Sequence, residues 1–431
     1  MSDAMVSWQE APLGELADIA IGGTPSRDVE SYWASDRTDG FPWVAISDLH
    51  GRIIRETKEQ ITAAGVNNSN VKLVTAGTVL MSFKLSLGRV AFAGRDLFTN
   101  EAIAAFKSRG EVAEDFLFYV LPEAVRTTAT DVAIKGATLN KESLKALRIP
   151  YPCKAVQQRI ATILTGIDTT IEKTEALIAK YQQIKAGLMH DLFTRGVLPN
   201  GQLRPPREQA PELYQETAIG WIPKEWQYEL LDKLALRGSG HTPNKNFPEY
   251  WNGGIKWVSL ADSHRLDQLY ISDTELQISH KGIQNSSAVL HPAGIVVLSR
   301  DAGVGKSAIT TEPMAVSQHF MCWKCDQKMD NHFLYYWLQF NKRTFENIAM
   351  GSTILTIGLA YFKKMKIACP IELEEQRNIA AKIKASDARI FSLQDELSKL
   401  KQQKQGLMHD LLTGKVLVTI ENKTTTTEAV A

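Results

Sequence analysis

The amino-acid sequence predicts an α+β fold with two tandem domains and two long helices, which pack as an antiparallel coiled coil with pseudo-twofold symmetry. Three observations support this prediction. One segment of 14 residues occurs twice, each copy ends a long heptad-patterned stretch, and the region before each stretch is rich in short strand-like runs and turn residues. With 431 residues, the chain is long enough for more than one hydrophobic core.

The repeated segment spans residues 185–198 and 404–417. Ten of its 14 positions are identical at a constant offset of 219 residues (404 − 185). Shorter matches at an offset near 218 precede it and include Trp8 with Trp226, Thr24-Pro25 with Thr242-Pro243, and Tyr32-Trp33 with Tyr250-Trp251. These matches indicate a tandem duplication. They predict a first domain over 1–152, a helix over 153–195, a linker over 196–224, a second domain over 225–370, a second helix over 371–415 and a flexible tail over 416–431.

Each domain is expected to contain a substantial irregular sheet. The runs 77–82 and 294–299 begin with glycine and continue with apolar and β-branched residues, as short buried strands do. The stretches 114–128 and 331–349 are more helical in character. Each domain should therefore combine strands, turns and helix.

The two long helices are predicted from an apolar stripe whose members are three, four or seven residues apart. Residues 156–193 contain no proline, and a helix of this length extends roughly 57 Å. A stripe this long needs a partner, and the other copy is the nearest one, although each helix could instead pack on its own domain. We expect coiled-coil or partner contacts from Ile160, Leu164, Ile171, Ile178, Leu188 and His190 in the first helix, and from Ile379, Ile383, Ile390, Leu397, Leu407 and His409 in the second.

The predicted linker is rich in proline, which fixes the backbone and removes a hydrogen-bond donor. Its prolines are Pro199, Pro205, Pro206, Pro211 and Pro223. We therefore expect an extended connector with few regular backbone hydrogen bonds.

Charge and cysteine content narrow the possible functions. The formal net charge of +1 excludes a uniformly basic surface, so a polyanion site must be a local patch or be completed by a partner. No signal sequence or membrane-spanning apolar run is recognisable, so we expect a cytoplasmic protein with reduced thiols and no membrane partner.

Cys322 and Cys325 have the spacing of half a zinc site, but no second such pair follows. Two cysteines packed on a strand are the alternative, and we expect no bound metal.

Two motifs suggest chemistry that the surrounding sequence does not support. Residues 303–307, Gly-Val-Gly-Lys-Ser, resemble part of a phosphate-binding loop, but the first glycine of that motif would fall at Arg300. A basic turn that reaches phosphates or base edges, or a plain hairpin, fits the segment. His190 and His409 are each followed by aspartate, but no further cluster of metal ligands accompanies them. Interhelical packing or a partner contact explains these histidines better.

We find no recognisable catalytic motif in the sequence. It contains neither the Asn-Pro-Pro-aromatic nor the Asp-Pro-Pro-aromatic signature of an amino-methyltransferase, and no glycine-rich cofactor loop. Glu56 and Lys58 form a lone Glu-x-Lys without the acidic residues of a nuclease site. We therefore expect a non-catalytic chain.

Polar, basic and aromatic residues cluster in the loop-rich parts of both domains. Core packing explains the tryptophans and tyrosines at least as well as base contact does. The polar and basic members are candidates for DNA contact: Thr24, Arg27, Lys84, Arg89, His241, Thr242, Lys245, Arg300 and Lys306.

Several segments together carry a resemblance to a known family. They are the duplicated Gly-Leu-Met-His-Asp-Leu helix ends, Gly-Thr-Pro-Ser at 23–26, His-Thr-Pro-Asn at 241–244, residues 298–306, the helix entries at 158–159 and 375–377, and Trp-Ile-Pro-Lys-Glu-Trp at 221–226. With these segments, essentially the whole chain resembles the specificity subunit of type I restriction-modification systems.

The resemblance implies two target recognition domains, each of which reads one half of a bipartite, asymmetric site in double-stranded DNA. It also implies that the paired helices set the spacing of the half-sites and dock two methylation subunits, which bring S-adenosylmethionine. Motor and nuclease subunits that use ATP and Mg²⁺ would complete the complex, and this chain would hold no cofactor of its own. Two alternatives stay open: a self-contained DNA-modifying enzyme with fused specificity, and a bivalent protein-binding adaptor.

Overall fold

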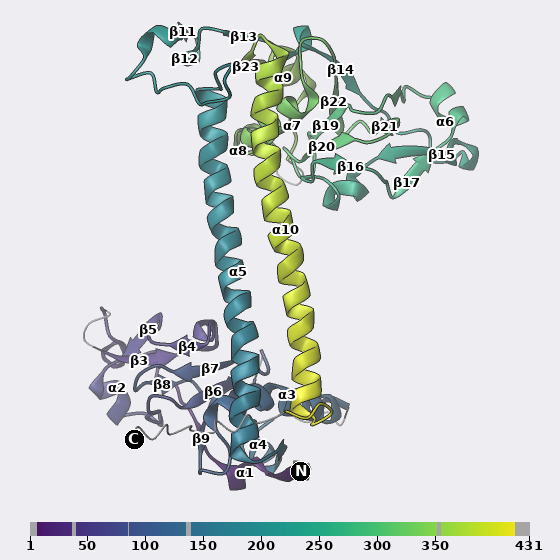
Figure 1. Ribbon diagram of the computed structural model, residues 1–431. Coiled ribbons are helices and arrows are strands. Elements are labelled where there is room, and N and C mark those ends of the chain that lie inside the picture. Colours follow the sequence, from purple (N-terminus) through teal and green to yellow (C-terminus); the bar gives the residue numbers. More distant parts are fainter. Residues whose placement is uncertain (1–6, 37–39, 85, 135–138, 351–354, 419–431) are drawn as a thin grey trace, which may run out of the picture. The chain divides into compact units, whose positions relative to one another are not determined.

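The computed structural model describes residues 7–36, 40–84, 86–134, 139–350 and 355–418. The chain forms two compact units, one of Met1–Glu175 with Asp395–Ala431 and one of Ala176–Gln394. Each unit contains one α+β domain, part of the long helix α5 (Lys154–Thr194) and part of the long helix α10 (Leu373–Leu412) (Figure 1). The predicted α+β class with two tandem domains is thus confirmed.

The first domain runs from β1 to β10. Its elements are β1 (Gln9–Pro12), α1 (Leu13–Leu16), β2 (Ala17–Ile21), β3 (Phe41–Val44), β4 (Ile53–Ile54), β5 (Glu59–Ile61), α2 (Ala63–Asn67), β6 (Val79–Ser82), β7 (Val90–Ala93), β8 (Phe98–Thr99), β9 (Ile103–Ser108), α3 (Glu114–Ile134), α4 (Lys141–Ala146) and β10 (Arg148–Tyr151). The main sheet has the order β2-β9-β6-β7-β4, and a smaller sheet has the order β5-β3-β8. In the main sheet only β4 and β7 pair in parallel, and β1 pairs with β10.

The second domain repeats this topology. Its elements are β13 (Trp226–Leu230), β14 (Ala235–Ser239), β15 (Trp251–Val258), β16 (Tyr270–Ile271), β17 (Leu276–Ile278), α6 (His280–Gln284), β18 (Leu290–His291), β19 (Val296–Ser299), β20 (Ser307–Thr310), β21 (Met314–Val316), β22 (Phe320–Cys325), α7 (Asn331–Phe340), α8 (Lys342–Ile348), α9 (Leu359–Lys364) and β23 (Lys366–Pro370). Its main sheet has the order β14-β22-β19-β20-β16, a second sheet has the order β17-β15-β21-β18, and β13 pairs with β23. The helical stretch predicted over 331–349 is two helices, which meet at Asn341.

The ends of the long helices belong to the domain cores. In the first unit, Ile160 and Leu164 of α5 pack in one apolar cluster with Leu411 and Leu412 of α10 and with α3. The second unit has the same arrangement, with Ile379 and Ile383 of α10 beside the end of α5. These four members of the stripe therefore share an apolar cluster with the helix's own domain as well as with the other long helix. A heptad pattern shows that a face is covered, but it does not show which element covers it.

Other members of the stripe are covered to different degrees. Leu188 and Leu407 are partly buried against the second and first domain cores, respectively. Ile171, Ile178 and Ile390 are buried, and Leu397 is half-buried.

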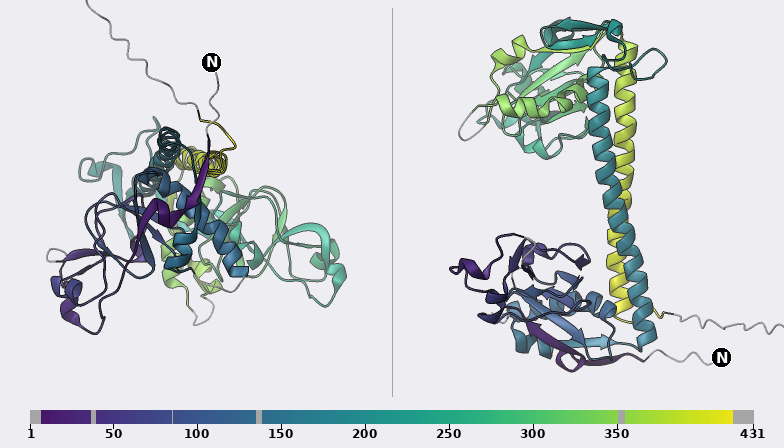
Figure 2. Two further views of the ribbon diagram at one scale, coloured as in Figure 1. Left: turned by 90° about the horizontal axis from the view of Figure 1, so that it is seen from below. Right: turned by 90° about the vertical axis from the view of Figure 1, so that its left-hand side faces the viewer.

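Within each unit the two long helices run antiparallel. In the first unit, Asp168 pairs with Lys404 at 2.6 Å and Glu175 pairs with Lys401 at 2.7 Å, so the partner's number falls as the number along α5 rises. In the second unit, Lys185 pairs with Asp387 at 2.5 Å, and Tyr181 lies under the guanidinium of Arg389. Figure 1 and the right-hand view of Figure 2 both show the helices side by side. The predicted antiparallel pairing is confirmed in both units.

Two of these ion pairs are copies of each other, because Asp168 and Asp387 are 219 residues apart, as are Lys185 and Lys404. In the first unit the Tyr119 hydroxyl on α3 also donates to Asp168 at 2.8 Å. A domain side chain and both long helices thus meet at one carboxylate.

A buried glutamine joins each long helix to its own domain. The Gln157 side chain is fully buried, accepts from the Ala113 amide at 2.8 Å and donates to the carbonyls of Glu111 and Pro152. Gln376 makes the same three bonds in the second unit, to Asp330, Lys328 and Pro370. The structural counterpart of Gln376 is therefore Gln157 and not the neighbouring Gln158, which is exposed.

The segment predicted as an extended linker is folded. It contains a hairpin of β11 (Tyr214–Thr217) and β12 (Gly220–Pro223) and is tied to the second unit by Arg204, whose guanidinium is buried and bonded to both carboxylate oxygens of Glu375. The prediction of few regular hydrogen bonds is wrong here, because an ion pair between residues 171 positions apart organises the segment.

Candidate nucleic-acid interface

Two tryptophans support the Gly-Thr-Pro loop that follows β2 in the first domain. The Trp43 indole N–H donates to the Gly23 carbonyl at 2.9 Å, and that of Trp33 donates to the Ser26 carbonyl at 3.1 Å. The two rings meet edge to face at 5.1 Å. Trp43 is almost fully buried, so these rings hold the loop from beneath.

The second domain holds its His-Thr-Pro loop in the same way. The Trp257 indole donates to the His241 carbonyl at 3.1 Å, the Trp251 indole donates to the Asn244 carbonyl at 3.4 Å, and the rings lie 5.2 Å apart. The four tryptophans thus support the loops of both domains through hydrogen bonds to backbone carbonyls. The polar residues of the two loops are therefore the remaining candidates for contact with a ligand.

Close approach of the backbone explains the glycine that begins each loop. A Cβ atom at Gly22 would lie 2.0 Å from the Thr99 carbonyl oxygen, and one at Gly240 would lie 1.6 Å from the Val316 carbonyl oxygen. Only glycine fits at such a distance. Each loop is thereby pressed against the last residue of β8 or β21, just before the turn that leads into β9 or β22.

The loop threonine has an equivalent contact in both domains but a different partner. The Thr24 hydroxyl donates to the carboxylate of Glu101, and the Thr242 hydroxyl donates to the side-chain carbonyl of Gln318. Glu101 and Gln318 are both exposed. The Thr24 hydrogen bond and the nearby cations of Lys84 and Arg27 lower the pKa of Glu101. At neutral pH this position is therefore an anion in the first domain and a neutral amide in the second.

The basic residues of the two loops also differ. Arg27 stacks on Trp33, with its guanidinium carbon 3.7 Å from the ring centroid, and binds Glu59 through both terminal nitrogens. Lys245, its counterpart, is exposed and has no ion pair within the described part of the chain. The counterpart of Glu59 is Leu276, since Thr57 and Thr274 make matching bonds to these two residues.

The glycine-basic segments are hairpin turns. Residues 300–306 connect the antiparallel strands β19 and β20, and the left-handed Gly305 (φ 85°) donates its amide to Ser299 as Gly88 (φ 77°) does to Ser82. A strand–loop–helix phosphate site is thus excluded for this segment. Lys306 is bonded to the carbonyl and hydroxyl of Ser263 at 3.0 and 3.1 Å. Its counterpart Arg89 is exposed, as is Lys84.

Arg300 and Asp301 form a polar cluster beside this turn. Arg300 donates to the backbone carbonyls of Gln318 and Ile357, so its guanidinium is used inside the domain. The buried carboxylate of Asp301 accepts from the Thr356 hydroxyl and lies 2.7 Å from the His319 ring. Sequence reasoning missed Glu101, Gln318 and His319, although aligning the two copies around Ser82 and Ser299 would have brought them out.

Within residues 7–36, 40–84, 86–134, 139–350 and 355–418, no group of three His, Cys, Asp or Glu side chains could hold a metal ion. His190 and His409 are exposed. Cys322 and Cys325 lie three residues apart on β22 and pack into different apolar clusters, because residues at this spacing point to opposite faces of a strand. Burial raises the pKa of the Cys322 thiol to about 12.

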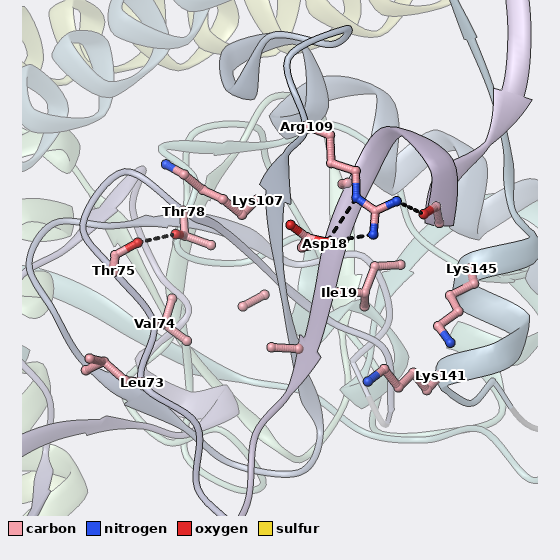
Figure 3. A pocket seen from close by; sticks show the side chains of 14 residues that line it. Asp18, Ile19, Leu73, Val74, Thr75, Thr78, Lys107, Arg109, Lys141 and Lys145 are labelled. Atoms are coloured by element: carbon pink, nitrogen blue, oxygen red, sulfur yellow. Dashed lines mark hydrogen bonds and ion pairs between the residues drawn. The ribbon is translucent and has the colours of Figure 1, made fainter.

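A cavity of about 370 Å³ lies on the first domain between β2, β9 and α4 (Figure 3). Four basic side chains line it, but most are occupied: Arg109 is bonded to Asp18, Lys107 pairs with Glu114, and Lys145 pairs with Glu142. We therefore assign no ligand to this cavity. None of the helices that the structure describes is long and apolar enough to cross a bilayer.

Comparison with known families gives two matches that follow the duplication. The type I restriction modification DNA specificity domain matches residues 5–183 and again 223–402. The chain belongs to this family. The resemblance seen in the sequence is thereby confirmed, and each copy of this specificity domain includes most of one long helix.

Full-length relatives of this specificity-domain chain carry consistent names. It is 22% identical over 432 residues to the type I restriction enzyme MjaIX specificity subunit of Methanocaldococcus jannaschii, with 95% of this chain and 94% of the relative aligned. It is 23% identical to the MjaVIII specificity subunit of the same organism, over 95% and 93% of the two chains.

Solved structures share the fold. The S subunit of a type I restriction-modification system from M. genitalium has a TM-score of 0.56 at 13% identity, over 95% of this chain and 97% of that chain. A chain from a study of assembly and conformational transition of the type I system has a TM-score of 0.59 at 17% identity, over 95% and 98%.

Proposed function

We propose that this chain is the DNA-specificity subunit of a type I restriction-modification complex, and that each recognition domain reads one half of a bipartite, asymmetric target. The proposal rests on one observation: both domains have the same tryptophan-supported loop, but the exposed polar side chains at that loop differ. The same tryptophan-supported loop presents Thr24 beside Glu101 in one domain and Thr242 beside Gln318 in the other. Two identical readers would call for a symmetric target, whereas two different readers suit an asymmetric one.

Five of the candidate residues are exposed and are proposed to contact DNA directly: Arg27, Lys84, Arg89, His241 and Lys245. Thr24 and Thr242 would act by orienting Glu101 and Gln318. Arg300 and Lys306 are engaged by the protein's own carbonyls, so in our proposal they shape the reading surface.

The chain would depend on partners for the rest of the reaction. We propose that two methylation subunits dock on the paired helices and bring S-adenosylmethionine, and that motor and nuclease subunits bring ATP and Mg²⁺. The chain itself would be non-catalytic and hold no cofactor. Its net charge of +1 supports this division, because much of the phosphate contact would then come from the partners.

The test is methylation of duplex DNA by the chain with and without its methylation subunit. Together they should methylate one bipartite sequence, which genome-wide mapping of methylated bases would identify. Methyl transfer by the chain alone would instead support a self-contained enzyme. A complex that retains no specific duplex would support a protein-binding adaptor.

A further inference from the structure

We propose that Glu101 and Gln318 are the specificity-determining residues of the first and second domains. Glu101 would accept a hydrogen bond from the exocyclic amino group of a cytosine. Gln318 would make paired donor and acceptor contacts with an adenine. The proposal rests on the proposed function, since it names what each reader detects at its half-site.

Topology places these two residues at one equivalent position. Glu101 lies two residues before β9 begins at Ile103, and Gln318 lies two residues before β22 begins at Phe320. Strand β2 pairs with β9, and β14 pairs with β22, so the loop after the first strand meets the turn before the second. The threonine contact closes this junction in both domains.

The surrounding contacts orient both side chains without burying them. Thr24 occupies one carboxylate oxygen of Glu101. Gln318 is held on its oxygen by Thr242, and its amide nitrogen lies 3.4 Å from Nε2 of His319. Both side chains remain exposed. An oriented and exposed polar group is suited to reading a base edge, because little rotamer freedom is left to lose on binding.

The chemistry of the two side chains selects different bases. An ionised carboxylate only accepts hydrogen bonds, so it matches the N4 amino group of cytosine. A carboxamide both donates and accepts, so it matches N7 and the N6 amino group of adenine. Gln318 keeps a free lone pair on its oxygen after the bond from Thr242, because an amide oxygen can accept two hydrogen bonds.

The residues beside Glu101 and those beside Gln318 also differ in charge. Lys84 is an exposed cation close enough to Glu101 to lower its pKa. At the equivalent position of the second domain, Asp301 is buried, and its carboxylate is taken up by His319 and Thr356. Asp301 thus positions His319, which in turn flanks Gln318. The cluster around each candidate reader is specific to its domain, whereas the tryptophan frame is common to both.

The experiment uses the full chain in complex with its methylation subunit and a library of duplexes with both half-sites randomised. Three variants are compared with the wild type: E101Q, Q318E, and E142Q as the control at an exposed carboxylate of α4. The two reader substitutions exchange nearly isosteric side chains, so we expect unchanged melting temperatures.

E101Q should change the preferred base at one position of one half-site by roughly tenfold or more, as the loss of a good base contact does. Q318E should do the same in the other half-site only, and E142Q should change neither. Unchanged base preferences in E101Q and Q318E would overturn the inference, and so would an equal loss on every sequence. If the wild-type complex methylates no defined bipartite site, it is the proposed function that fails.

Discussion

Single buried side chains do much to fix each long helix to its domain. Gln157 and Gln376 are fully buried and satisfy one amide and two carbonyl groups each. Buried polar groups without partners are costly, so no apolar residue can replace these glutamines without loss. The sequence shows a glutamine near each helix start, but it does not show which of two adjacent glutamines turns inward.

Replacing Gln157 with leucine should destabilise the first unit by about 2–4 kcal/mol, because one buried and two partly buried backbone groups lose their partner. Thermal or urea unfolding monitored by circular dichroism measures the change. The control is Q158L at the exposed neighbour, which should cost less than about 0.5 kcal/mol. Equal losses in the two variants would contradict the assignment of Gln157 as the anchor.

The second unit should lose stability as the pH falls below about 6.5, the ordinary value for histidine. Burial lowers the pKa values of both His291 and His332. The unfolded chain therefore binds more protons than the folded chain between the ordinary and the lowered pKa. Stability consequently rises with pH across this window and is lost as the pH falls through it.

Urea unfolding at a series of pH values tests this dependence. H291Q should reduce the slope of stability against pH, because a half-buried ring whose pKa is lowered in the folded chain is gone. H190Q, at an exposed histidine of the same unit, is the control variant for the substitution itself. A wild-type midpoint that does not change between pH 7 and pH 5 would refute the prediction.

The long helices are the part of the fold that the sequence predicts best, and the surfaces that cover their apolar stripes are the part it predicts least. The heptad stripe predicted a helix over 153–195, and α5 spans Lys154–Thr194. The stripe carries no information on the covering surface, which is why Ile160 and Ile379 turn out to pack in domain cores. The folded linker was not predictable for a related reason. Its organising contact joins Arg204 to Glu375, and no local pattern reports a pair so distant in sequence.

The duplicated ion pairs should fix the antiparallel register of α5 and α10. Lys404 and Asp168 are largely shielded, with side-chain exposures of 31% and 15%. K404D should destabilise the first unit by placing two carboxylates together, and the added D168K should recover most of the loss. A double-mutant cycle should give a coupling of about 1–2 kcal/mol.

The exposed pair of Lys401 with Glu175 is the matched control for this cycle. Its side chains are 55% and 48% exposed, so its coupling should be only about 0.2–1 kcal/mol. A coupling for Lys404 and Asp168 no larger than that of the control would show that the pair does not specify the register.

At the scale of the whole molecule, the sequence predicted the duplication, and the family match to both copies confirms it. The division into compact units was not predictable from the order of elements. The first unit takes in residues from the end of the chain as well as the beginning, because Leu411 and Leu412 complete a core that starts with Leu13. Contacts of this kind depend on the three-dimensional path and leave no trace in local composition.

Exchanging residues 1–152 for the same region of a relative should change one half of the recognised site and leave the other half unaltered. The reason is that Glu101 and its loop lie wholly within the exchanged region, while Gln318 lies outside it. Methylome mapping of a host that carries the chimera measures the outcome. The foreign domain must still accept Leu411 and Leu412, so a relative with apolar residues at Leu13 and Phe116 should be chosen. Changes in both half-sites would refute independent readers.

The composition of the first unit has a consequence for biosynthesis. The second unit is one uninterrupted stretch, Ala176–Gln394, and every residue it needs has been synthesised before Asp395 is added. The core of the first unit is complete only after Leu412 of α10 has been synthesised, although the first domain is synthesised before the second. Nascent domains generally fold as soon as their chain is complete, the N-terminal one first. In this protein the order of completion is reversed, and a chain that terminates early lacks the residues that finish its first domain.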